Sequence, residues 1–282
     1  MNRLTLAFCR VAAASCLCAL TGLTPAQEAA KAATKPFEPY VGLPGKDVIW
    51  LPADLVMVNK MMELAKTGPG DVVVDLGSGD GRTVIGAARH GARGIGVEFN
   101  QDLVEHSRSN AAKEGVSDRV NFIRQDLFEF DLSQVSVITL FLLPSINLKL
   151  RPALLNLKPG TRVIGNTFTM EDWQHDESIR DESKPNCSFN CVAYLWVVPA
   201  KAAGTWKMPS GELKLEQTFQ MLSGTLTSGG KSVPVAGRMR GDQISFTADG
   251  VQYTGRVSGL DMGGTLKTKG APDGWRALRI GG

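Results

Sequence analysis

The chain has 282 residues, which is enough for about two domains of ordinary size. Apolar residues make up 43% and charged residues 21%, values typical of globular proteins, so a largely disordered, collagen-like or coiled-coil chain is excluded. Lysine and arginine number 31 against 28 aspartate and glutamate residues, so the charge gives no general case for binding nucleic acid and we expect no such partner.

Residues 1–26 have the features of a secretory signal peptide. They include Arg3 and Arg10 but no acidic residue, and residues 11–23 form an apolar run too short to span a bilayer. Small residues follow, so cleavage before Gln27 is expected. The sequence therefore predicts export to the periplasm or beyond, with no membrane span left after cleavage. The alternatives are a mitochondrial or a cytoplasmic location.

Residues 27–46 are rich in alanine, lysine and proline and are expected to form a linker. Between residues 47 and 200, β-prone runs alternate with helical patterns, which predicts a Rossmann-like, doubly wound, mostly parallel sheet with helices on both faces. The expected strands cover 71–76, 94–98, 120–124, 135–142 and 162–169, with an antiparallel strand at 191–198. The expected helices cover 55–66, 82–90, 101–114 and 147–157.

Residues 204–282 differ in character from the preceding region. They contain many glycines, no cysteine and short alternating runs that are separated by turn signals such as Gly241-Asp242 and Asp249-Gly250. Such spacing predicts a small all-β meander that closes into a barrel or a sandwich. The chain is thus expected to be an α/β domain followed by an all-β domain.

The expected first strand of the α/β region runs directly into a glycine-rich turn with the sequence DLGSGDGR. A dinucleotide-binding turn needs the spacing G-x-G-x-x-G, whereas here the glycines are spaced G-x-G-x-G. Asp75 and Asp80 would repel a pyrophosphate but suit a cationic ligand. S-adenosylmethionine carries a sulfonium and an ammonium group, so the acidic turn favours it. Gly77, Gly79 and Gly81 allow the backbone to approach the ligand closely.

Two further acidic residues follow neighbouring strands of the expected sheet. Glu98 ends the second strand, where a carboxylate can accept hydrogen bonds from both ribose hydroxyls. Asp126 follows the third strand and is expected to face the adenine amino group. Taken singly, each could be a helix cap or a solvated loop charge, but together they predict an S-adenosylmethionine site. The expected cofactor-binding residues are Asp75, Gly77, Ser78, Gly79, Gly81, Glu98, Asn100 and Asp126.

Residues 47–176 resemble the class I, seven-strand methyltransferases, in particular the family of the ATP synthase c-subunit lysine N-methyltransferase. The matching stretches are Leu51-Pro-Ala53, Asp75-Leu-Gly-Ser-Gly-Asp-Gly-Arg82, Gly96-Val-Glu-Phe-Asn100, Gln125-Asp-Leu127, Leu143-Pro144 and Phe168-Thr-Met-Glu-Asp-Trp173. The resemblance implies a class I fold and cofactor contacts at Asp75, Gly77, Gly79, Glu98 and Asp126. The familiar members sit in mitochondria and lack a C-terminal β domain, so the substrate is not carried over.

The acceptor side of the expected site follows the fourth strand, in the sequence Phe141-Leu-Leu-Pro144. Many amino-group methyltransferases hold the acceptor nitrogen there with an Asp or Asn side chain, and this chain has none, which argues against methylation of DNA bases. Backbone carbonyls of Leu142 and Leu143 could orient an amine instead. We expect Leu143, Pro144 and Trp173 to lie on the substrate side.

Glu171 and Asp172, after the fifth strand, are candidates for accepting the proton of a lysine. The alternative for both is a helix-starting acidic turn. The sequence thus predicts an enzyme that N-methylates an amine, a protein lysine, by in-line transfer. The alternatives are a small-molecule methyltransferase, or an exported binding protein whose methyltransferase fold is silent.

Cys187 and Cys191 are the two cysteines outside the predicted signal peptide, and no second pair is present that could complete a zinc site, so no metal is expected. A straight strand would separate their Cα atoms by about 13 Å. A disulfide needs less than about 7 Å, so the pair can form only across a turn. Asn186 and Asn190 favour such a turn, and we expect the two thiols to be able to bridge.

Overall fold

The computed structural model describes residues 37–267 and 273–281. The predicted signal peptide and the first part of the predicted linker lie outside these residues. Among the residues that are described, no helix has the length and apolarity needed to cross a bilayer.

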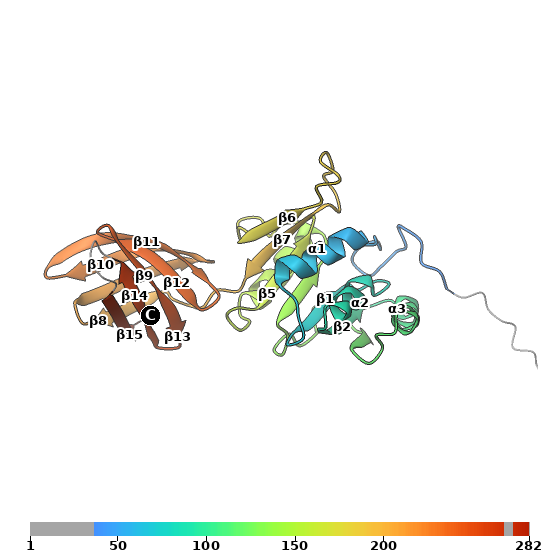
Figure 1. The fold of residues 1–282 in the computed structure, drawn as a ribbon, viewed down its shortest axis with the longest axis horizontal. Coiled ribbons are helices and arrows are strands. Elements are labelled where there is room, and N and C mark those ends of the chain that lie inside the picture. Colours follow the sequence, from blue (N-terminus) through green and yellow to red (C-terminus); the bar gives the residue numbers. More distant parts are fainter. Residues whose placement is uncertain (1–36, 268–272, 282) are drawn as a thin grey trace, which may run out of the picture. The chain divides into compact units, whose positions relative to one another are not determined.

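The α/β domain contains a seven-stranded sheet in the order β3-β2-β1-β4-β5-β7-β6 (Figure 1). The strands are β1 (Val72–Leu76), β2 (Arg93–Glu98), β3 (Val120–Arg124), β4 (Val137–Leu140), β5 (Arg162–Asn166), β6 (Glu177–Arg180) and β7 (Val192–Val197). The first five are parallel, and β7 pairs antiparallel with both β5 and β6. This confirms the predicted class I architecture, to which the structure adds the short edge strand β6.

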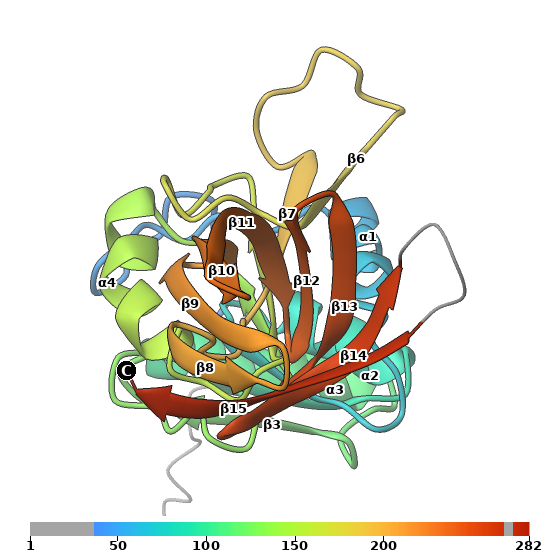
Figure 2. The same ribbon diagram turned by 90° about the vertical axis from the view of Figure 1, so that its left-hand side faces the viewer.

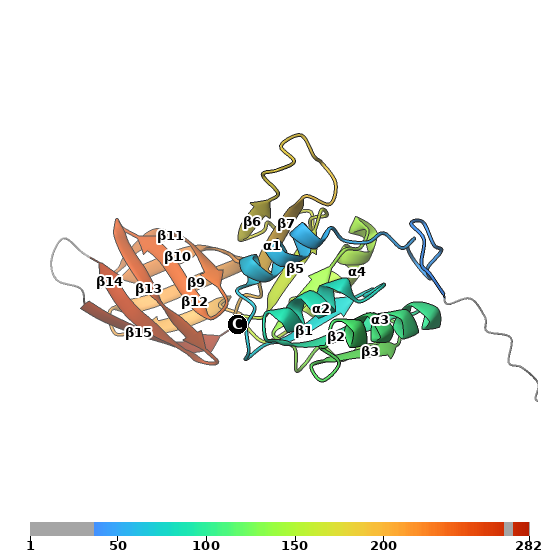
Figure 3. The same cartoon turned by 45° about the vertical axis from the view of Figure 1, so that its right-hand side comes forward.

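Helices cover both faces of this sheet. They are α1 (Leu55–Ala65), α2 (Arg82–Arg89), α3 (Gln101–Lys113) and α4 (Pro144–Leu154), and Figure 3 shows α2 and α3 beside β1, β2 and β3. Successive residues of a strand point to opposite faces, so the buried neighbours Val73 and Val74 belong to different cores. Val73 packs in one core with the methionines of α1, and Val74 packs in another with the apolar residues of α4.

Two helices begin at side chains that satisfy free backbone N–H groups. Asp54 caps α1, where its Oδ1 accepts a hydrogen bond from the backbone N–H of Val56 at 2.8 Å. Asn100 caps α3 and accepts from the N–H of Asp102 at 2.9 Å. Such caps contribute about 1 kcal/mol each and fix where the preceding loop ends. Both loops end at the carboxyl edge of the sheet.

The barrel is a closed sheet of eight antiparallel strands (Figure 2). The strands are β8 (Gly204–Met208), β9 (Gly211–Thr218), β10 (Met221–Ser228), β11 (Lys231–Arg240), β12 (Gln243–Ala248), β13 (Val251–Ser258), β14 (Asp261–Lys267) and β15 (Asp273–Gly281). Each strand pairs with the next along the chain, and β15 pairs with β8. The predicted meander therefore closes as a barrel.

Large side chains fill the inside of the barrel. Trp206, Phe246 and Trp275 are buried there, and the Phe246 ring stacks on Tyr253 with 4.5 Å between ring centroids. In a barrel of eight strands, side chains of this size are enough to fill the interior. The barrel is therefore a packed unit of its own, and its core shares no residue with the cores of the α/β domain.

Candidate active site

A cavity opens at the carboxyl ends of the parallel strands, where ligands bind in open α/β sheets. Five segments meet there. They are the glycine turn after β1, the end of β2, the loop after β3, the loop after β4 and residues 43–53, which we call the strap. Among the predicted site residues, the cavity is lined by Asp75, Gly77, Ser78, Gly79, Glu98 and Asp126.

The glycine turn forms the floor of the cavity. The backbone N–H groups of Gly77 and Ser78 both donate to the carbonyl of Val97, at 2.8 and 3.0 Å, which ties the turn to β2. Gly79 has φ +53°, and a Cβ atom there would lie 2.3 Å from the indole of Trp50. A side chain at this position would thus collide with the strap, so close packing across the cavity requires glycine.

Glu98 is held by the backbone on two sides. Its Oε2 accepts a hydrogen bond from the N–H of Gly79 at 3.0 Å, and its Oε1 accepts one from the N–H of Asn100 at 2.9 Å. Each carboxylate oxygen can accept a second bond. The carboxylate is therefore fixed in place with acceptor capacity left for a pair of vicinal hydroxyls, as a ribose offers.

Asp75 lies beneath the turn and is almost fully buried. Its Oδ1 accepts a hydrogen bond from the hydroxyl of Thr139 at 2.6 Å. Burial raises the pKa of Asp75 to about 7, against the hydrogen bonds from Thr139 and Thr83 that lower it, with smaller contributions from the nearby acids Glu98 and Asp80. Asp75 thus supports the turn from below and keeps a proton in mildly acidic solution.

Asp126 occupies the opposite wall of the cavity. Its Oδ1 accepts from the N–H of Phe128 at 3.0 Å, and its Oδ2 forms an ion pair with Lys46 of the strap. The hydrogen bond from Lys46 holds the pKa of Asp126 below its usual value. The ammonium of Lys46 also lies 5.0 Å from the ring centre of Phe99, a distance at which a cation is attracted to an aromatic face. Lys46 therefore contacts both Phe99 and Asp126, the residue predicted to face adenine.

The strap was missed as part of the site by the sequence reasoning, which expected a linker up to residue 46. All of residues 43–53 line the cavity, and Trp50 lies across from Gly79. The strap is tied down by Arg82, whose Nη1 donates to the carbonyl of Ala53 at 2.9 Å while Nη2 pairs with Asp80 at 2.5 Å. The one sequence feature that could have revealed the strap is Leu51-Pro52-Ala53, which matches the family. This stretch has neither the helical nor the strand periodicity, so no element was predicted there.

Comparisons with known proteins place this cavity in context. Residues 75–177 match the family model described as ANTKMT methyltransferase domain. The Protein-lysine N-methyltransferase of Saccharolobus islandicus is 37% identical over 166 residues, which cover 58% of this chain and 95% of that protein. The human ATP synthase c-subunit lysine N-methyltransferase is 35% identical over 128 residues, which cover 45% of this chain and 54% of that protein. The chain thus spans only about half the length of the human relative.

The chain belongs to the family of these lysine N-methyltransferases. A solved structure agrees with the assignment to methyltransferases. The RNA methyltransferase of Salinibacter ruber in complex with S-adenosyl-L-homocysteine is 46% identical and superimposes with a TM-score of 0.50, covering 54% of this chain and 95% of that one. The chain is therefore an S-adenosylmethionine-dependent methyltransferase, as its glycine turn and acidic residues predicted.

The residues of this methyltransferase fit the cofactor. Ser78 lines the cavity, while its hydroxyl is buried against Gly96 of β2 without a hydrogen-bond partner in the described residues. The turn at Gly79 leaves no room for a side chain, and Glu98 offers fixed acceptors. We predict that these residues contact S-adenosylmethionine.

Four other predicted residues lie next to the cavity and do not line it. Gly81 adopts φ +82° below the turn, where a Cβ would lie 2.7 Å from the Phe122 ring, so its role is in packing. Asn100 caps α3, and Pro144 begins α4. Leu143, the residue before α4, is exposed to solvent beside Leu142, which does line the cavity.

The three predicted residues after β5 are not brought to the cavity. Trp173 has no exposed surface and packs against Trp196 and Phe219, so it is a core residue and not a substrate contact. Asp172 is exposed and pairs with Arg151 of α4. Glu171 is also exposed, in a left-handed turn with φ +53°. The geometry therefore gives no support to either acid as the base.

The two cysteines form the disulfide that the sequence made possible. Cys187 and Cys191 are bonded, with 6.2 Å between their Cα atoms, within the loop that joins β6 to β7. We call residues 181–191 the disulfide loop. Asn190 adopts φ +57°, the left-handed conformation that asparagine tolerates well, and so provides the turn that brings the sulfur atoms together.

Proposed function

We propose that this methyltransferase acts on the side-chain amine of lysine in proteins. The observation that carries the proposal is the rim of the cavity after β4. Phe141 and Leu142 line it, and neither side chain can hydrogen-bond the exocyclic amino group of a base. An apolar rim suits the long aliphatic part of a lysine side chain. The relative from Saccharolobus islandicus, 95% of which is covered, is described as a protein-lysine N-methyltransferase, and this supports lysine as the acceptor.

In the proposed reaction the cofactor supplies a methyl group bound to a sulfonium. With the cofactor bound, a neutral amine would attack its methyl carbon, the electrons of the carbon–sulfur bond would stay on sulfur, and the new ammonium would release a proton to solvent. The chain's own part is positioning: Glu98 and the glycine turn fix the cofactor, and the rim after β4 directs the amine. Positioning of this kind can supply roughly 7–11 kcal/mol of the barrier.

The acceptor lysine must be neutral before it reacts. Glu171 and Asp172 do not line the cavity, so neither is placed to take the proton. Burial disfavours the charged form of an amine, and Leu142 is only 3% exposed. We propose that desolvation at this rim lowers the pKa of the lysine, so that water suffices as the base.

RNA is the second candidate acceptor. It is favoured by one observation, the 46% identity to a solved protein described as an RNA methyltransferase. The modest excess of basic residues, 31 against 28 acidic ones, gives it no electrostatic support. The two acceptors are separated by the experiment below.

The test uses the purified full chain with tritium-labelled S-adenosylmethionine. Three acceptor pools are compared: a lysine-rich protein mixture, the same mixture with its lysines acetylated, and total RNA. We expect label in the first pool only, recovered as methyl-lysine after hydrolysis. At a cofactor concentration near the wild-type Kd, Glu98→Ala should reduce the signal at least several-fold, and the matched surface variant Glu105→Ala on α3 should not change it. Label that persists in the acetylated mixture, or appears in RNA, would reject lysine as the acceptor.

We further propose that the protein is exported and that its mature form begins near Gln27. The Cys187–Cys191 disulfide supports this, because disulfides persist in oxidising compartments and are rare in the cytosol. Cell fractionation followed by N-terminal sequencing tests the proposal. Recovery of an uncleaved chain in the cytosol with two free thiols would contradict it.

A further inference from the structure

Three phenylalanine rings from separate segments meet beside the cavity. Phe141 follows β4, Phe168 follows β5 and Phe189 belongs to the disulfide loop. Ring centroids are 5.6 Å apart for Phe141 and Phe189, 6.1 Å for Phe168 and Phe189, and 6.3 Å for Phe141 and Phe168. We call these three residues the aromatic cluster. Phe141 also lines the cavity, so the cluster continues its rim outwards.

The cluster is open to solvent on one side. Phe189 is 45% exposed, whereas Phe141 and Phe168 are half-buried behind it. At centroid distances of about 6 Å the rings touch one another, so no cation fits between them. The cluster therefore offers an open aromatic wall, made of rings at different tilts, and not an enclosing cage.

The backbone next to the cluster is held in an unusual conformation. Thr167 and Asn190, the neighbours of Phe168 and Phe189, both have positive φ, +68° and +57°. A β-branched residue such as threonine rarely adopts such a φ, because its side chain then crowds the backbone. The two residues hold each other, because the N–H of Asn190 donates to the hydroxyl of Thr167 at 2.7 Å. Strain of this kind persists where the surroundings fix it, and it is concentrated at functional sites.

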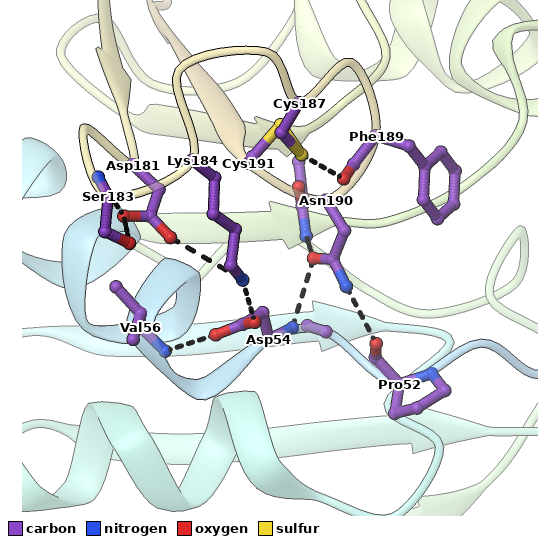
Figure 4. A network of polar contacts seen from close by, with 12 residues as sticks. Pro52, Asp54, Val56, Asp181, Ser183, Lys184, Cys187, Phe189, Asn190 and Cys191 are labelled. Carbon is purple, nitrogen blue, oxygen red and sulfur yellow. Dashed lines mark hydrogen bonds and ion pairs between the residues drawn. A yellow bond between two sulfur atoms is a disulfide. The ribbon is translucent and has the colours of Figure 1, made fainter.

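The disulfide loop is also bound to the strap (Figure 4). The side chain of Asn190 donates to the carbonyl of Pro52 at 3.0 Å and accepts from the N–H of Asp54 at 3.1 Å. Lys184 pairs with Asp54 at 2.6 Å, next to the start of α1. Pro52 lines the cavity. One loop thus carries an exposed aromatic ring and is anchored to the wall of the cofactor cavity.

The disulfide closes directly around Phe189. Cys187 and Cys191 flank it within five residues, and Cys191 is fully buried at the start of β7. The disulfide closes a covalent loop of only five residues. Such a short loop has few conformations, so the positions that Phe189 can take are limited. The ring is therefore presented to solvent from a restrained support.

We propose that the aromatic cluster is the acceptor-side recognition surface, with Phe189 as its outermost contact, and that the disulfide keeps Phe189 in place. The inference rests on the proposed lysine acceptor. A lysine that enters along this surface passes the rings of Phe189 and Phe168 before it reaches Phe141 at the cavity. Aromatic rings attract ammonium ions, including methylated ones. The wall therefore receives the lysine while it is still charged, before it loses its proton at the rim, and it receives the methylated product as well.

The test measures binding of a cation apart from turnover. The probe is Nα-acetyl-Nε-trimethyl-lysine amide, titrated by saturation-transfer NMR into the full chain saturated with S-adenosylhomocysteine. Phe189→Leu keeps an apolar side chain but removes the aromatic face. Its matched control is Phe37→Leu, since Phe37 packs edge-on against His106 and does not line the cavity. We expect Phe189→Leu to weaken probe binding about three- to five-fold and the control to leave it unchanged.

Two further measurements make the inference falsifiable. The affinity for S-adenosylhomocysteine should be equal in all variants, and reduction of the disulfide in the wild-type chain should weaken probe binding in the same direction as Phe189→Leu. With the lysine-rich mixture, Phe189→Leu should raise KM and leave kcat nearly unchanged. Probe binding and KM that match the wild type in Phe189→Leu would overturn the inference even if lysines are methylated. Probe binding that depends on Phe189 would support it even if turnover is not detected.

Discussion

Polar side chains are buried throughout the α/β domain and almost nowhere in the barrel. Within the described residues, the buried polar or charged side chains include Asp75, Ser78, Asp80, Thr139 and Asn166, and the one that belongs to the barrel is Gln220. Burying a polar group costs free energy unless a partner satisfies it. The α/β domain bears that cost at several places, among them the edge where its cavity opens, whereas the barrel fills its interior with apolar side chains. The difference indicates that the chemistry resides in the first domain and that the second is built for packing.

The largest expected effect is on the stability of the barrel. Phe246 is 2% exposed and stacks on Tyr253, so Phe246→Ala should destabilise the barrel by about 3–5 kcal/mol. Calorimetry should show one transition move to lower temperature, while the affinity for S-adenosylhomocysteine at 15 °C stays at the wild-type value. A parallel loss of cofactor affinity would break the comparison, because it would couple the barrel core to the cavity.

The second effect is a pH dependence that only the α/β domain should show. An unfolded aspartate ionises near pH 4, whereas burial keeps Asp75 protonated until about pH 7. The folded state therefore holds an extra proton between these values. Its stabilising contribution is complete below about pH 4 and is lost as pH rises through 7, on the order of 2–4 kcal/mol in all. Denaturant unfolding of Asp75→Asn should not show this loss of stability with rising pH. An equal loss in the variant would show that another titrating group causes it.

The third effect concerns the cofactor. Glu98 holds two backbone N–H groups and is predicted to bind the ribose, so Glu98→Ala should weaken S-adenosylmethionine binding by about 1–3 kcal/mol. Isothermal titration calorimetry measures the change, with Glu105→Ala as the control. If Glu98→Ala has the wild-type melting temperature and the wild-type affinity for S-adenosylmethionine, Glu98 does not bind the cofactor.

The smallest effect is expected from removing the barrel. All residues that line the cavity lie between Leu43 and Ile146, so a chain shortened to end at Lys201 should bind S-adenosylhomocysteine within about two-fold of the full chain. Its melting temperature should fall, because Phe219, which stacks on Trp173, is lost. A shortened chain that melts cooperatively but binds no cofactor would show that the domains share the site.

The sequence was most informative where residues follow strands. Asp75, Glu98 and Asp126 come from segments up to 51 positions apart, yet they were predicted to meet because parallel strands end at one edge of the sheet. The barrel was predicted from its alternation and turns. The ends of strands, the alternation of apolar residues and the turn residues are all recognisable within a few neighbouring residues of the sequence.

Other features could not be read in this way. The strap has no period, and its proline and glycine residues are those of a linker, so its packing over the glycine turn depends on distant contacts. Trp173 was placed on the substrate side and belongs to a stretch that matches the family. The chain instead turns back there through a bridge between Met170 and Trp173, and the indole enters the core. Burial of a loop residue is decided by tertiary packing, which a local pattern does not report.

The position of Trp50 gives the protein a natural optical reporter. Of its five tryptophans, Trp173, Trp196, Trp206 and Trp275 are buried in cores, and Trp50 alone is partly exposed. Its indole lies against Gly79 on the floor of the cavity. A ligand that enters must change the surroundings of this indole, while the other four emit from constant environments. The intrinsic fluorescence of the unlabelled chain therefore follows occupancy of the cavity, in stopped-flow as well as at equilibrium, without modification of any residue.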